Sequence, residues 1–319
     1  MRRKGGACVT ATVAVFAAAL ALLPIGPARA ASLWGADYFP NVPLTTQDRV
    51  TVRLYDDLLK GKAVAVNLIY TTCKDECPLE TARLVQVQRL LGDRVGRDIF
   101  FYSISIDPKR DTPEALKAYA EKFGVGPGWL FLTGKEEDIK LVAKKLGLSR
   151  RNDAVNLDGH QPTLMLGDEP AGRWMRNSAV ASPKFLAKTI GNFLGWENPQ
   201  RARSQAEVAQ LRAPKTGGEY TFQTRCSTCH TIGKGDGLGP DLAGVTTRRD
   251  RGWLVRYLKA PDEVLAEKDP IAVALSTQYK NVPMPNLRLS DAEIAALLGY
   301  LEAQTVARED TKGKEAAAR

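Results

Sequence analysis

Two closely spaced cysteine pairs carry the chemistry that this 319-residue sequence suggests. The second pair reads Cys226-Ser-Thr-Cys229-His230, the C-x-x-C-H signature of covalent c-type haem attachment. Each thiol forms a thioether to the porphyrin, and the histidine that follows directly is placed to bind the iron. A four-ligand zinc site is disfavoured because no cysteine or histidine follows His230. The motif predicts one covalent haem c, attached through Cys226 and Cys229 and ligated by His230.

A second axial ligand is predicted at Met284. This methionine is flanked by two prolines in a loop before the last predicted helix, residues 290–304. Met165 and Met175 lie in the first predicted domain, residues 31–195, where we expect them to pack in the protein interior. Ligation by histidine and methionine raises the reduction potential and leaves no open iron position. It therefore favours electron transfer over oxygen or peroxide chemistry.

The first cysteine pair, Cys73 and Cys77, lies between a nearly continuous apolar run, residues 63–70, and a segment with helical periodicity, residues 77–91. A helix start offers unpaired amide N–H groups and a positive dipole end, and both favour thiolate over thiol. The spacing of four places the sulfurs one turn apart, where they can share a metal or form a disulfide. A static structural disulfide is the alternative, but the strand–helix junction favours a reactive pair.

His160 is the one histidine outside the haem motif. A lone histidine is more often a surface or core residue, but His160 directly precedes a predicted strand, residues 163–166. In an α/β domain the loop before that strand can face the loop that carries Cys73 and Cys77. Two thiolates and one imidazole suit copper, especially Cu(I).

Alternating strand and helix patterns over residues 31–195 predict an α/β domain around a central sheet. Residues 196–216 have no clear apolar stripe and are predicted to be a linker, followed by a helical domain over residues 217–305. The tail, residues 306–319, is charged and alanine-rich and is predicted to be disordered. Beyond the segments already given, the expected elements are strands over 99–106, 129–132 and 172–175 and helices over 112–123, 136–146 and 183–194.

The first 30 residues have the features of a secretory signal peptide: a basic start, an apolar run and Ala28-Arg29-Ala30 as a cleavage site. We expect cleavage after Ala30 and export to the periplasm, and an uncleaved N-terminal membrane anchor is the alternative. The formal charge of +9 falls to about +5 (9 − 4) without the leader, which holds Arg2, Arg3, Lys4 and Arg29 and no acidic residue, and this mild positive charge favours encounter with acidic partners. No dense basic run with interleaved aromatic residues is present, so nucleic-acid binding is not expected.

The first domain resembles the Sco/SenC family, which comprises thioredoxin-like proteins of cytochrome oxidase assembly. The matching pieces are Cys73-x-x-x-Cys77-Pro78, the Ser105 to Pro113 stretch, Trp129 to Gly134, and His160. The resemblance implies one copper bound by Cys73, Cys77 and His160 and delivered to the cytochrome c oxidase subunit with the binuclear copper site. It also implies thiol reduction of that target's cysteines. Asp107, Arg110 and Asp111 belong to the matching stretch and have no role assigned beyond shaping the site.

The second domain resembles the class I cytochromes c. The resemblance rests on the haem motif, the run Gly239-Pro240-Asp241-Leu242, Trp253, Met284 and the final helix. It implies an all-α haem domain that exchanges electrons with other redox proteins. Aromatic and aliphatic side chains are expected to pack against the haem or in the core, namely Tyr220, Phe222, Trp253 and Leu297.

One departure from the Sco pattern keeps a second interpretation open. Pro162 follows His160 by two residues, and the Pro-Thr-apolar order resembles the thioredoxin loop in which a cis-proline faces the redox cysteines. A cis Gln161–Pro162 bond is therefore hypothesised. The alternative function is a thiol–disulfide oxidoreductase coupled to the cytochrome, with Cys73 and Cys77 as its catalytic pair and no copper delivery. Whether the protein is an enzyme thus stays open, and a peroxidase is the weakest interpretation.

Overall fold

The computed structural model describes residues 34–149, 161–196 and 216–317. The expectations for the leader, for His160 and for most of the linker lie outside these ranges. Within the three ranges, no helix combines the length and the apolar character needed to cross a membrane.

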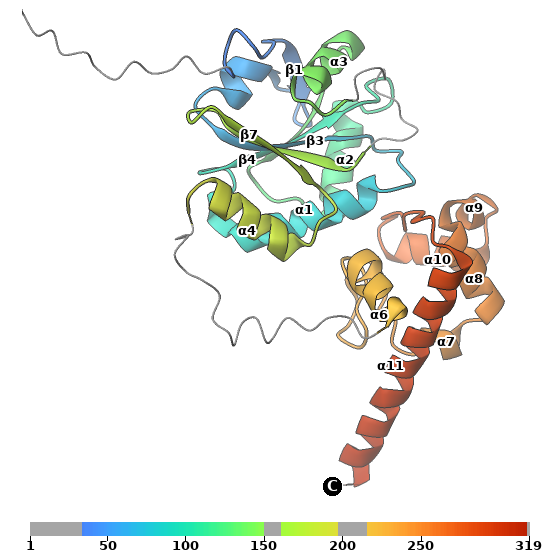
Figure 1. The fold of residues 1–319 in the computed structure, drawn as a ribbon. Coiled ribbons are helices and arrows are strands. Elements are labelled where there is room, and N and C mark those ends of the chain that lie inside the picture. Colours follow the sequence, from blue (N-terminus) through green and yellow to red (C-terminus); the bar gives the residue numbers. More distant parts are fainter. Residues whose placement is uncertain (1–33, 150–160, 197–215, 318–319) are drawn as a thin grey trace, which may run out of the picture. The chain divides into compact units, whose positions relative to one another are not determined.

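The first domain is built on a seven-stranded sheet with the strand order β2-β1-β5-β4-β3-β6-β7 (Figure 1). The strands β3, β4 and β5 are parallel, whereas β1, β2, β6 and β7 pair antiparallel with their neighbours. The strands are β1 (Pro43–Thr46), β2 (Thr51–Arg53), β3 (Ala63–Ile69), β4 (Phe100–Ser105), β5 (Trp129–Thr133), β6 (Thr163–Asp168) and β7 (Arg173–Ser178).

The strand β3 lies inside the sheet, parallel to β4 on one side and antiparallel to β6 on the other. All of its residues after Ala63 are buried. Helices cover both faces of the sheet, and such burial requires the nearly continuous apolar run seen in the sequence. The prediction of a doubly buried strand over residues 63–70 is confirmed.

Two apolar clusters pack on the opposite faces of the sheet. One contains side chains of α1, α2 and α4, and the other contains side chains of η1 and α3. Figure 1 shows α1 and α4 together beneath the sheet and α3 above it. These elements are η1 (Leu54–Leu59), α1 (Cys77–Leu91), η2 (Gly92–Arg94), α2 (Pro113–Phe123), α3 (Glu136–Lys145) and α4 (Pro183–Phe193).

Local signals explain where two of these helices begin and end. The helix α1 begins at Cys77 with Pro78 in its first turn, where the missing N–H costs no hydrogen bond. The helix α2 is capped by Thr112, whose hydroxyl accepts a hydrogen bond from the Ala115 amide, and it ends at Gly124 in the left-handed conformation. Both helices match the sequence predictions.

The second domain is helical, as predicted, with a core from η3, α8 and α11. The short helix α6 crosses α11 so closely that a Cβ on Gly218 would lie 2.0 Å from the Ala296 carbonyl oxygen. Only glycine permits this crossing. The helices are α6 (Gly217–Thr221), η3 (Phe222–Cys226), α7 (Val245–Arg248), α8 (Arg251–Lys259), α9 (Pro261–Ala266), α10 (Pro270–Gln278) and α11 (Asp291–Ala317).

Two expectations were wrong. The tail beyond residue 305 is not irregular, because α11 continues to Ala317. The tail is rich in alanine, glutamate and lysine, all strong helix formers, so the helix extends past the part that packs. The Gln161–Pro162 peptide bond is trans, since the described residues contain no cis bond. The thioredoxin-like cis-proline is therefore absent.

Candidate metal and redox sites

The dithiol lies where β3 ends and α1 begins. Cys73 closes a turn, with its amide N–H donating to the Tyr70 carbonyl oxygen at 3.2 Å. Cys77 is the first residue of α1. The two residues are 5% and 0% exposed, and the pair is present as two thiols rather than as a disulfide. The predicted position at the helix start is confirmed.

The two thiols differ in acidity because one stabilises the other. The Cys77 thiol donates a hydrogen bond to the Cys73 sulfur and lowers the Cys73 pKa more than burial raises it. The backbone N–H groups of Cys77 and Asp75 and the Tyr70 hydroxyl also donate, and the pKa of Cys73 settles at about 7. The hydrogen bond to Cys73 and burial raise the pKa of Cys77, which keeps its proton. Near neutral pH the site thus holds one thiol that ionises readily, Cys73, and one that stays protonated, Cys77.

Glu80 lies one turn after Cys77 and is fully buried. Its Oε1 accepts a hydrogen bond from the Asn67 side chain at 2.7 Å, whereas its Oε2 has no hydrogen-bond partner among the described residues. Burial raises the Glu80 pKa well above its ordinary value, outweighing the hydrogen bond from Asn67. The carboxyl group is therefore protonated at neutral pH, because a buried charge without a cation is costly.

The third predicted copper ligand, His160, lies outside the described residues. Within them, no group of three or more histidine, cysteine or acidic side chains is placed to hold a metal ion. Cys73 and Cys77 alone supply two sulfur donors, which is an incomplete site for copper. The ligand set of Cys73, Cys77 and His160 stays a prediction.

His230 has the orientation that a haem ligand needs. Its Nδ1 lies 2.9 Å from the Pro240 carbonyl oxygen, so Nδ1 carries the proton and Nε2 is left to bind iron. Burial lowers the His230 pKa, and the bond to Pro240 offsets part of that effect, so the ring is neutral. A Cβ on Gly239 would lie 2.6 Å from His230 Cε1, so only glycine lets the loop lie against the ring.

The residues around His230 fit a covalent haem. Both haem-motif thiols and His230 line one cavity. The remaining walls are largely apolar and include Leu242, Trp253, Leu254, Leu297, Leu301 and the predicted ligand Met284. Two thiols, an imidazole with its Nε2 available and a thioether form the donor set of a c-type haem with two axial ligands.

The glycine-rich loop after His230 is organised by Asp241. Its carboxylate accepts hydrogen bonds from the amides of Gly233, Gly235 and Ala243 and from the Thr231 hydroxyl. Burial raises the Asp241 pKa, but these hydrogen bonds outweigh it and bring the pKa down to about 2. An ionised carboxylate therefore holds the loop that carries Pro240 and Gly239 at neutral pH.

Among the expected packing residues, Phe222 and Leu297 are buried in the core. Trp253 lines the haem cavity and donates its Nε1–H to Asp269. Tyr220 was predicted to pack in the interior, but it is 59% exposed. The helix α6 directs this position outward and turns Phe222 inward. Tyr70 and Glu80 were not predicted from the sequence as residues of the dithiol site. The signal that could have identified them is spacing, because Tyr70 lies three residues before Cys73 and Glu80 lies three residues after Cys77.

The fold and the two sites define a thioredoxin-like domain with a helix-start dithiol, followed by a cytochrome c domain. The SCO1/SenC family model matches residues 43–177, and the cytochrome c model matches residues 216–305. An SCO2-like protein of Rickettsia conorii is 36% identical over 144 residues, which cover 43% of this chain and 68% of the relative. The chain belongs to the SCO1/SenC family and carries a cytochrome c domain after the Sco domain.

Two solved structures are similar to parts of the chain. A SCO1/SenC family lipoprotein from Bacillus anthracis is 26% identical with a TM-score of 0.42, over 48% of this chain and 93% of that one. A cytochrome c domain from Pseudomonas putida is 57% identical with a TM-score of 0.27, over 28% of this chain and 88% of that one. The chain spans 51% and 60% of two further SCO2-like relatives, from Rickettsia felis and Rickettsia prowazekii.

We expect the alkylation rate of the reduced, copper-free protein to rise with a midpoint near pH 7, the pKa of Cys73. Only the thiolate reacts, so the fast phase is present above this pH and is lost below it. Iodoacetamide labelling followed by mass spectrometry measures the rate at each cysteine. Cys73→Ser should abolish the fast phase. A midpoint at the ordinary thiol pKa of about 8.5 would contradict the thiol arrangement.

We expect Glu80→Gln to stabilise the protein increasingly as the pH rises. The folded-state pKa of this acid is raised, so the wild type loses stability above the unfolded-state pKa of about 4.3, where only the unfolded chain ionises. Glutamine keeps the contact with Asn67 but has no proton to lose. Denaturation of the full chain at pH 5 and pH 7.5 measures the difference. Glu137→Gln, at an exposed position, is the control, and a gain independent of pH would rule out this account.

We expect Gly239→Ala to displace His230 without removing the haem. The new methyl group would lie 2.6 Å from the ring, whereas the thioethers to Cys226 and Cys229 are unaffected. Absorption and electron paramagnetic resonance spectra of the ferric protein should show a larger high-spin fraction. Gly299→Ala is the matched control, because its Cβ would have nothing within 4 Å. Wild-type spectra for Gly239→Ala would show that the loop does not position His230.

Proposed function

We propose that this protein is an exported copper-binding chaperone and thiol redox protein for cytochrome c oxidase assembly, fused to an electron-transfer cytochrome. The observation that carries the proposal is the buried Cys73–Cys77 pair at the start of α1, with the Cys73 pKa at about 7. Membership of the SCO1/SenC family supports the same conclusion.

Copper is the cargo in this proposal. The Cys73 thiolate is available at neutral pH and is the first donor to meet the ion. Cys77 releases its proton as its sulfur binds, and the His160 imidazole completes the set. Two thiolates and an imidazole select Cu(I) over harder cations. Burial of both sulfurs limits their reaction with solvent oxidants.

The haem contributes one-electron transfer when it is attached. In the proposed arrangement Cys226 and Cys229 anchor it, and the Pro240 carbonyl oxygen holds His230 in the tautomer that ligates iron. Met284 would supply the other iron ligand, and the domain would then transfer electrons rather than bind oxygen. A one-electron centre matches the Cu(II)/Cu(I) couple, whereas reduction of a Cys73–Cys77 disulfide needs two electrons. Fusion raises the effective concentration of one centre near the other.

The proposed partner is the oxidase subunit that carries the binuclear copper site, with other redox proteins as electron donors or acceptors. The basic charge favours encounter with acidic surfaces. The leader-like first 30 residues support a periplasmic location after cleavage at Ala30, with a membrane anchor as the alternative.

The second candidate is a thiol–disulfide oxidoreductase that acts without copper. It is favoured by the Cys73 pKa of about 7, because a thiol attacks disulfides best when its pKa is near the ambient pH. The trans Gln161–Pro162 bond removes the feature that linked this loop to thioredoxin. The copper proposal therefore has the greater support.

An anaerobic Cu(I) titration of the reduced, haem-loaded protein tests the proposal. We expect one equivalent to bind tightly in competition with a chelator. The Cys73→Ser/Cys77→Ser double variant should lose this binding because both sulfur donors are gone. His160→Ala should weaken it by about tenfold or more, because one of three ligands is removed.

Met175→Leu is the matched control, since it removes a half-buried thioether of the same domain that is outside the proposed ligand set. It should leave the titration unchanged. Absence of tight Cu(I) binding, with disulfide exchange retained, would instead establish the oxidoreductase. Binding that survives His160→Ala unchanged would refute His160 as a ligand.

A further inference from the structure

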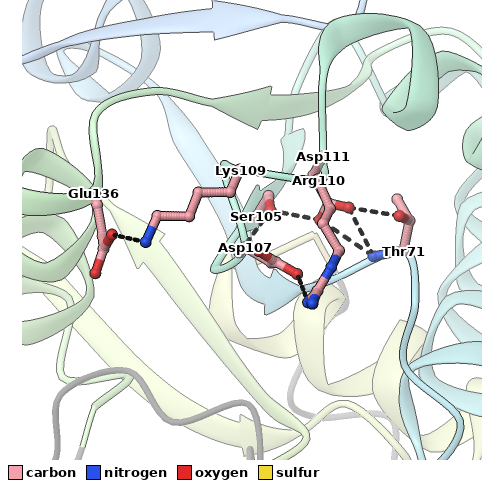
Figure 2. A network of polar contacts seen from close by, with 7 residues as sticks. All are labelled: Thr71, Ser105, Asp107, Lys109, Arg110, Asp111 and Glu136. Carbon is pink, nitrogen blue, oxygen red and sulfur yellow. Dashed lines mark hydrogen bonds and ion pairs between the residues drawn. The ribbon is translucent and has the colours of Figure 1, made fainter.

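The fully buried carboxylate of Asp111 connects two loops that are far apart in the sequence (Figure 2). The loop between β4 and α2 carries Asp111, and the segment after β3 carries Thr71. The Thr71 amide N–H donates to Oδ2 at 3.1 Å, and the Thr71 hydroxyl donates to Oδ1 at 2.5 Å. Asp111 therefore binds both the backbone and the side chain of Thr71.

The Asp111 carboxylate is also held by contacts with the end of β4 and with its own β4–α2 loop. The Ser105 hydroxyl accepts the Asp107 amide N–H at 3.0 Å, so its own hydrogen donates to Asp111 Oδ2 at 2.5 Å. The Asp111 amide donates to the Asp107 carbonyl oxygen at 2.9 Å. Arg110 pairs with the Asp107 carboxylate at 2.9 Å. The β4–α2 loop is thus a rigid support for Asp111.

Burial of the Asp111 carboxylate costs free energy, so stabilisation of the fold alone does not explain this residue. Burial raises the Asp111 pKa, and the donors that lower it, Ser105 and Thr71, are neutral. A carboxylate buried without a cation costs more than a neutral residue at the same place. The position of Thr71 suggests a second role for the contact, because Thr71 is two residues before Cys73 and lies inside the turn from Tyr70 to Cys73 that places the Cys73 sulfur.

We propose that Asp111 is a positioning residue for the dithiol: by fixing Thr71 it sets the position of the Cys73 sulfur relative to Cys77. The inference rests on the proposed function in taking this pair as the working site. While Asp111 holds Thr71, the Cys73 sulfur stays within reach of the Cys77 thiol and of the amide N–H groups at the start of α1. When this contact is lost, the Cys73 thiolate is less stabilised and the two sulfurs are less well placed to bind copper.

Substitution on both sides of the contact tests this inference. Asp111→Asn turns one acceptor oxygen into a donor that faces donors, so at least one hydrogen bond is lost. Thr71→Val removes the hydroxyl from the other side, and Thr71→Ser keeps it. We expect Asp111→Asn and Thr71→Val to move the alkylation midpoint of Cys73 above pH 7 and to weaken Cu(I) binding by about tenfold. Thr71→Ser should behave as the wild type.

Glu169→Gln is the control for loss of a carboxylate elsewhere in the domain. Glu169 accepts hydrogen bonds from the Tyr55 hydroxyl and the Gly61 amide, next to the end of β3 that is remote from Cys73. It should lower the denaturation midpoint without changing either dithiol measurement. If Asp111→Asn and Thr71→Val also lower only that midpoint, the role is structural and the inference is overturned.

The alkylation profile needs no copper, so it separates this inference from the proposed function. If the wild type binds no Cu(I) tightly, the copper proposal fails, and the pH profile still decides the role of Asp111. If Asp111→Asn does not fold, the Thr71→Val and Thr71→Ser pair decides it, because valine replaces the Thr71 hydroxyl with a methyl group whereas serine keeps the hydroxyl. Equal alkylation midpoints in that pair would overturn the inference.

Discussion

The strand-to-helix junction between β3 and α1 is the constraint on which the first domain depends. The strand is held inside the sheet by β4 and β6, so its end is fixed in space. The helix begins at Cys77, and the amide N–H groups of its first turn have no partner within the helix itself, so they can serve the preceding turn. A sulfur at Cys73 meets these donors and the Cys77 thiol together. The junction thus favours a thiolate through the Cys77 thiol, the Tyr70 hydroxyl and backbone N–H groups.

The haem site uses backbone groups in a similar way. The Pro240 carbonyl oxygen selects the tautomer of His230, and Gly239 allows the chain to lie against the ring. The loop that carries both residues is held by the Asp241 carboxylate through three backbone amides. In both domains, backbone hydrogen bonds rather than long side chains set the geometry of the donor atoms, which makes that geometry rigid.

Three acidic residues show how environment decides the role of a carboxyl group. Glu80 has one neutral partner and an oxygen without one, so it is held protonated in the core. Asp241 accepts several amide N–H groups at a partly exposed site, and its pKa falls to about 2, so it is ionised at neutral pH. Asp111 lies between these cases, because it is fully buried but surrounded by donors. Its surroundings suit a group that connects two loops rather than one that titrates.

Both cysteine pairs, His230 and the order of strands and helices were readable from the sequence, because motif spacing and hydrophobic periodicity are local properties. The helix α1 was predicted at residues 77–91, where it lies, because Pro78 marks its first turn and its apolar residues recur at helical spacing. The contact between Asp111 and Thr71 could not be predicted from the sequence, because it joins residues 40 positions apart. The burial of Glu80 could not be predicted either, because the sheet that covers it is assembled from distant strands. The exposure of Tyr220 was likewise decided by tertiary packing, which selects among faces that the local sequence leaves open.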